Sequence, residues 1–111
     1  NSNLLHYYNS PGHYVELINF AQKNKIDLKE YDLKNFLLLL IKNSYYKKDN
    51  FINRCIYQYI EFYLLNLLNQ NNSQNVYFIC KKFIKKIHNM HKYNLDEESF
   101  FIEFKTSMLN G

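Results

Sequence analysis

The stretch FINRCIYQYIEFYLLNLL, residues 51–68, decides the fold class of this chain. Its apolar residues recur at intervals of three and four, which is the spacing of one face of an α-helix. They are Phe51, Ile52, Cys55, Ile56, Tyr59, Ile60, Tyr63 and Leu67. Arg54, Gln58 and Glu61 fall on the opposite side. The stretch therefore predicts a long helix with a wide buried face and a narrow polar strip.

Two helices are predicted before this stretch. A serine followed by a proline at 10–11 is a favourable N-cap and first helical position, and it predicts a helix over about 11–24. The second helix begins at Asp27 or, if it is short, at Asp32. It contains FLLLLI, residues 36–41, which is apolar on nearly every side and therefore predicts a central, buried helix.

Two helices are predicted after it. Ser73 is a natural N-cap for a helix over about 74–90, and an acidic first turn begins a last helix over about 96–109. The polar link before the quoted stretch supplies Asp49 or Asn50 as the N-cap of that helix. Because all the links are short, neighbouring helices should pack antiparallel.

The composition supports a helical fold. Only two glycines and one proline occur in 111 residues, whereas an all-β fold with many tight turns needs more of both. We therefore predict an all-α fold of four to five antiparallel helices, either a compact bundle or a short stack of helical hairpins. Residues 1–111 are expected to form a single helical domain that belongs to a larger protein.

Several classes of function lack support in the sequence. There is no phosphate-cradling glycine loop and no spacing that supports a catalytic triad or dyad, so we predict a non-enzymatic protein without a cofactor. His88 and His91 are one helical turn apart, but no third ligand lies at usable spacing, so no metal site is predicted. Cys55 and Cys80 lie in apolar helical patterns and are predicted to be buried thiols of an intracellular protein. No membrane-spanning segment is predicted.

A basic segment, KKFIKKIHNMHK at 81–92, is the strongest candidate site. Four of its cationic or titratable side chains fall within an arc of about 60° on a helix, and Lys82 and Lys86 lie further round. The four are Lys81, Lys85, His88 and Lys92. This stripe is either a solvated helix face or a surface that meets a run of phosphates, with Lys47 and Lys48 in support. The phenylalanines of the last helix should cover the opposite, apolar side, which consists of Val76, Ile79, Cys80, Phe83, Ile87 and Met90.

Tyrosines beside lysines form a second candidate surface. Tyr45, Tyr46 and Tyr93 lie at predicted helix ends or links. Exposed tyrosines at such places are typical of protein interfaces and can also stack on bases. The alternative is that each ring is buried in a corner between helices and leaves its hydroxyl in water.

The helices also show a faint repeat. A shift of about 43 residues aligns the apolar positions of DLKNFLLLLIKNSYY with those of SQNVYFICKKFIKKI. With their following segments, FINRCIYQYI and LDEESFFIEF, these units resemble the degenerate helical repeats that precede the RAP domain in organellar RNA-binding proteins of apicomplexans and in their FASTK relatives. They also resemble HEAT and armadillo-like repeats. The first resemblance implies RNA handling in a mitochondrion or plastid.

These observations predict a function of binding rather than of catalysis. The leading hypothesis is a protein–protein interaction domain, a scaffold or adaptor part of a larger protein. The alternative is an RNA-binding helical repeat that uses the basic face. The net charge of +4 permits an anionic partner without requiring one. A small-molecule ligand is not expected, and the predicted intracellular location, cytoplasmic or organellar, stays open.

Overall fold

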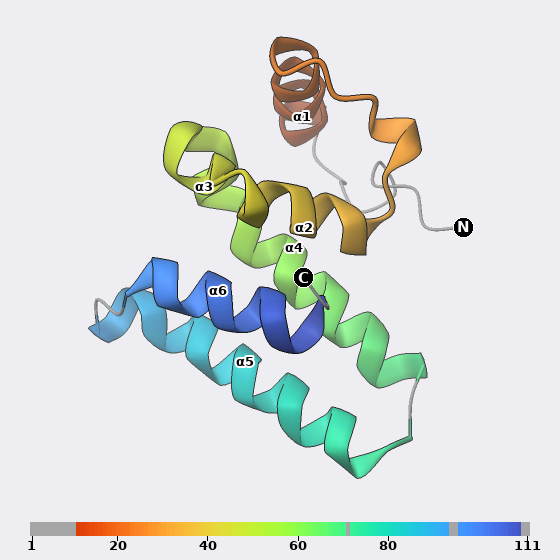
Figure 1. Cartoon of the computed structure of the whole chain (residues 1–111), viewed down its shortest axis with the longest axis vertical. Helices are drawn as coiled ribbons and strands as arrows, with labels where there is room; N and C mark the ends of the chain where they lie inside the picture. The colour runs from red at the N-terminus through yellow and green to blue at the C-terminus, as the bar shows by residue number, and fades with distance from the viewer. Residues whose placement is uncertain (1–10, 71, 94–95, 110–111) are drawn as a thin grey trace. The chain divides into compact units, whose positions relative to one another are not determined.

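The computed structural model describes residues 11–70, 72–93 and 96–109, and the side chains of 11–13 and 91–93 lie outside the description. The described residues form six α-helices and one 3₁₀ turn and contain no β-strand (Figure 1). The elements are α1 Pro11–Lys23, η2 Leu28–Glu30, α2 Leu33–Lys42, α3 Tyr45–Lys48, α4 Asn50–Gln70, α5 Gln74–Tyr93 and α6 Glu97–Met108. The predicted all-α fold class is confirmed.

The chain forms two compact units. The first ends at Tyr59 and the second begins at Ile60, so the boundary falls inside the continuous helix α4. We predicted one domain over 1–111, and the stretch at 51–68 that predicted the fold class supplies core residues to both units.

Aspartates begin four of the helical elements, η2, α2, α4 and α6, as the sequence predicts. In the first unit, Asp27 accepts a hydrogen bond from the backbone N–H of Lys29 and begins η2. Asp32 accepts one from the N–H of Asn35, at 2.8 Å, and begins α2. The two candidate starts of the second helix are therefore both used, because a separate 3₁₀ turn precedes the helix. In the same way, Asp49 accepts a hydrogen bond from the backbone N–H three residues further along the chain and caps α4.

The link at 43–50 differs from its prediction. It contains the helical turn α3, which follows Ser44 in the left-handed backbone region at φ 56°. The ring of Tyr45 lies edge-on to Phe20 with 5.2 Å between centroids, and Tyr46 is only 4% exposed. A segment that carries two tyrosines therefore folds onto α1 and buries apolar area, where we predicted a polar link without a helical turn.

An aromatic cluster forms the core of the first unit. Phe36 of α2 is fully buried and lies edge-on to Phe20 of α1, to Tyr31 and to Tyr59 of α4, with centroids 6.5, 6.4 and 5.7 Å apart. Burial raises the pKa of the Tyr59 hydroxyl. We predicted that the segment 36–41 is buried, and this is confirmed for four of its residues, Phe36, Leu37, Leu40 and Ile41. Leu38 and Leu39 are half-exposed, so α2 covers the core with one face rather than with all sides.

The second unit packs α5 and α6 with the C-terminal part of α4. The buried ring of Phe83 on α5 lies 6.1 Å from Phe100 and 5.4 Å from Phe104 of α6. Tyr63 of α4 packs edge-on to Phe104 at 6.2 Å, and its hydroxyl donates to the backbone carbonyl of Met108 at 3.2 Å. The last helix therefore covers the apolar side of α5, as predicted.

Both cysteines are buried free thiols, as predicted. Burial raises the pKa of Cys55 to about 12 and raises the pKa of Cys80. Since the thiolate is the reactive form, this environment opposes nucleophilic and redox chemistry at either sulfur. Their role here is to fill core space as small apolar groups.

Candidate functional site on helix α5

Helix α5 has one buried and one exposed face. Cys80, Phe83, Ile87 and Met90 are between 0% and 5% exposed. The lysines lie on the other side, with Lys81, Lys82 and Lys85 exposed and Lys86 partly covered. The predicted division of the basic segment into a core side and a lysine side is therefore confirmed.

Two of these lysines form ion pairs within the second unit. Lys82 Nζ lies 3.2 Å from Glu103 Oε2 of α6, and Lys86 Nζ donates to Glu103 Oε1. Their ammonium groups also lie 5.7 and 5.9 Å from the centroid of the Phe83 ring beneath them. The acidic residues at 96–98 are close in sequence to these lysines, so the sequence pattern suggests that they offset the lysine charge. It does not identify Glu103. That residue reaches the lysines because α6 folds back along α5.

The Glu103 cluster makes stability depend on pH. The hydrogen bond from Lys86, followed by that from Lys82, holds the pKa of Glu103 below its ordinary value of 4.5. A carboxylate with a lowered folded-state pKa stabilises the fold above its unfolded-state pKa, and the contribution is lost as pH falls through the folded-state pKa. We expect Glu103→Gln to destabilise by no more than about 1 kcal/mol at pH 7, because the pair is solvent-exposed.

This difference between wild type and Glu103→Gln should shrink as the pH falls below 4.5 towards the lowered folded-state pKa, and it should shrink in high salt. Urea titrations of both proteins between pH 7 and pH 3 would measure it. A difference that stays constant over this range would show that the carboxylate charge is not its source.

The remaining predicted site residues of α5 differ in their surroundings. His88 Nε2 lies 3.9 Å from Glu61 Oε1 of α4, so the histidine is placed at the edge next to that helix. Lys81 and Lys85 form no ion pair with any residue that the structure describes. The Lys81 ammonium lies 5.7 Å from the ring centroid of Tyr77. Lys92 and Tyr93 have side chains outside the described part, as has His91.

Exposed apolar side chains accompany the free lysines. Phe78 is 65% exposed, Tyr77 49% and Ile79 41%, and the rings of the first two meet edge-on at 5.8 Å. The prediction placed Ile79 on the core side, and it is wrong for that residue. The sequence does contain a signal for Phe78, because it precedes Lys81 by three residues and Lys85 by seven and so shares their face. We call Phe78, Lys81 and Lys85 the Phe78 stripe.

The predicted residues of α3 belong to the first unit. Lys47 and Lys48 are exposed, and their ammonium groups lie 6.0 Å and 5.5 Å from the rings of Tyr46 and Tyr45, respectively. Tyr45 is half-buried and Tyr46 is buried. The alternative in which tyrosine rings fill corners between helices therefore describes these two residues, and Tyr46 is not available for the interface that we predicted.

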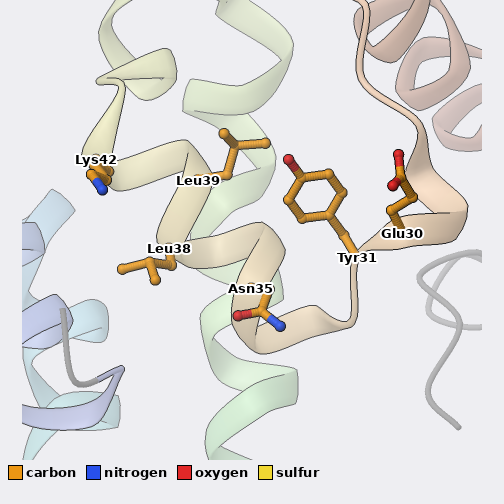
Figure 2. A pocket seen from close by; sticks show the side chains of 6 residues that line it. All are labelled: Glu30, Tyr31, Asn35, Leu38, Leu39 and Lys42. Atoms are coloured by element: carbon orange, nitrogen blue, oxygen red, sulfur yellow. The ribbon is translucent and has the colours of Figure 1, made fainter.

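A surface hollow beside α2 was not predicted. It has a volume of about 410 Å³, and a carboxylate and an ammonium group are among its lining groups. Its lining residues are Glu30, Tyr31, Asn35, Leu38, Leu39 and Lys42 (Figure 2). The Tyr31 ring leans toward Leu39, and the two half-exposed leucines of α2 supply the apolar part. The hollow is open to solvent rather than enclosed, unlike most sites that hold small molecules.

Other kinds of site have no counterpart in the described ranges 11–70, 72–93 and 96–109. No three His, Cys, Asp or Glu residues among them are grouped so that they could hold a metal ion. None of the helices there has the length and apolar character that crossing a bilayer requires. Comparison with protein-family models gave no match, and neither curated proteins nor solved structures matched. The resemblance to organellar helical repeats therefore stays a prediction.

Proposed function

We propose that this chain is a non-enzymatic docking module that binds another protein through the exposed face of α5. The observation that carries the proposal is the exposure of Phe78, a large aromatic side chain in the second turn of a regular helix. A phenylalanine left in water forgoes about 1.5–3 kcal/mol that burial would provide. Aromatic residues are also enriched in protein interfaces, where they act as anchors.

The distribution of exposed apolar side chains supports this proposal. Eight large apolar side chains are exposed among the described residues, and six of them belong to the second unit. Those six are Phe62, Leu65, Tyr77, Phe78, Ile79 and Ile102. Three of the six, Tyr77, Phe78 and Ile79, are consecutive on α5. Single exposed apolar residues are normal, whereas a cluster of them is typical of interaction surfaces.

A photo-crosslinking experiment tests this function. A photoreactive amino acid replaces Phe78 in one variant and the exposed Thr106 of α6 in a control, and both are expressed in the native cell. We expect a discrete protein adduct at position 78 only. The purified partner should then bind the wild-type chain at least tenfold more tightly than Phe78→Ala. Equal adducts at both positions, or none at 78, would contradict the proposal.

RNA binding is the second candidate function. The Lys81 ammonium lies over the exposed ring of Tyr77, and Phe78 and Lys85 lie on the same helix face. This face combines cations with stacking surfaces, as in proteins that bind single strands. If RNA is the ligand, affinity for mixed oligomers should fall steeply with salt, and Lys81→Glu with Lys85→Glu should abolish it. An absence of binding at low salt would remove this candidate.

A further inference from the structure

The charges on α5 restrict what its exposed face can bind. The helix sequence at 74–93 contains no aspartate or glutamate. Lys81 and Lys85 are one helical turn apart, where two like charges repel. No described acidic side chain compensates either of them, whereas Lys82 and Lys86 share Glu103. Among the α5 lysines whose side chains the structure describes, the uncompensated positive charge is therefore confined to the Phe78 stripe.

Carboxylates border this stripe on two sides. Glu103 lies on the side that faces α6, where it holds Lys82 and Lys86. Glu61 of α4 lies near His88 on the other side. A polyanion wider than the stripe would meet both carboxylates, and like charges at an interface are unfavourable. The surface thus favours a ligand whose negative charge is short and narrow.

The apolar part of the stripe adds a second requirement. Phe78 lies seven residues before Lys85, which corresponds to about 10 Å along the helix axis. The Tyr77 ring, with the Lys81 ammonium over it, extends the apolar surface beside Phe78. A matching ligand needs an apolar side chain against Phe78 and carboxylates about one and two helical turns further along.

We propose that the Phe78 stripe binds an acidic segment of a partner protein, in which apolar residues pack on Phe78 and Asp or Glu side chains pair with Lys81 and Lys85. This inference rests on the proposed docking function and specifies the partner's chemistry. Two uncompensated lysines suit a short acidic peptide better than RNA. The affinity of RNA-binding proteins grows with the number of phosphates that they neutralise.

Peptide display on the purified 111-residue chain tests this inference. A random library of 12-residue peptides is selected, and the best peptide is synthesised together with a copy in which Gln and Asn replace Glu and Asp. We expect selected peptides to carry at least two acidic residues beside an aromatic or aliphatic one. The neutral copy should bind at least tenfold more weakly.

Matched chain variants locate the binding. The double substitution Lys81→Glu with Lys85→Glu should lower the affinity for the acidic peptide at least tenfold, and Phe78→Ala should lower that affinity several-fold. Lys25→Glu with Lys29→Glu makes the same charge change on exposed residues of the first unit and should leave affinity unchanged. Far-UV circular dichroism confirms that each variant is helical. A peptide in which lysines replace the acidic residues should regain affinity for the chain variant that carries Lys81→Glu and Lys85→Glu.

The outcomes separate this inference from the proposed function. Peptides that need Phe78 but bind equally well without their acidic residues would overturn the inference and leave the docking function standing. If no peptide is selected while a 20-nucleotide RNA or an anionic phosphatidylserine vesicle binds through Lys81 and Lys85, both proposals are wrong. The inference would also be overturned if Lys25→Glu with Lys29→Glu lowered the peptide affinity as much as Lys81→Glu with Lys85→Glu.

Discussion

Replacing Phe104 by alanine should destabilise the protein by about 3–5 kcal/mol, the cost of truncating a fully buried phenylalanine. Its side chain is 0% exposed and lies at the centre of the second unit. It packs edge-on to Phe83 and Tyr63 and is stacked on Phe100, with centroids 6.3 Å apart in the last pair. The substitution removes the contacts of this ring with both α4 and α5 and leaves a cavity.

Urea unfolding followed by far-UV circular dichroism would measure this loss. Ile102→Ala is the matched control, because Ile102 lies two residues away on α6 and is 51% exposed. Surface substitutions of this kind usually change stability by less than about 0.5 kcal/mol. If Phe104→Ala cost no more than the control, α6 would not cover α5 in the way described.

Gln58→Pro should destabilise by about 3 kcal/mol or more, because it interrupts α4 near the boundary of the two units. Proline removes one backbone donor and its ring clashes with the carbonyl four residues earlier. Gln58 is exposed, so the substitution removes no core side chain. The cost therefore reports the continuity of the helix from Asn50 to Gln70.

Gln58→Ala is the control for this experiment, and it should be neutral or slightly stabilising, since alanine has the highest helix propensity. Chemical unfolding and the helical signal at 222 nm would be compared for the two variants. A proline variant that retained nearly the full stability of the alanine variant would mean that α4 acts as two separate helices joined at the unit boundary.

The basic segment at 81–92 illustrates how tertiary contacts change the meaning of a sequence pattern. On the helix it forms a broad positive stripe of four lysines and a histidine before its C-terminal end. The fold then places Glu103 against two of those lysines and Glu61 near the histidine. Among the lysines of this segment whose side chains the structure describes, only Lys81 and Lys85 have no carboxylate partner, and the exposed ring of Phe78 lies on the same helix face.

The sequence by itself determined five of the six described helices, all except α3. Their starts are local events, because a side-chain oxygen at Asp32, Asp49 or Asp96 satisfies backbone donors only two or three residues away. Their buried faces follow from apolar spacing, which is also local. The ends were less exact: α4 continues to Gln70 and α5 to Tyr93, beyond the predicted 68 and 90. Helix ends depend on weak signals.

Only the tertiary structure decided which side chains meet across helices. Burial of Tyr46 and the pairing of Glu103 with two lysines each depend on contacts between separate elements of the chain. The division into two units inside α4 is of the same kind. Periodicity shows that a residue lies on a helix face, but it does not show what packs on that face. The five long helices and the lysine face of α5 were therefore predictable from sequence, and the pairing of Lys82 and Lys86 with Glu103, which leaves Lys81 and Lys85 unpaired, was not.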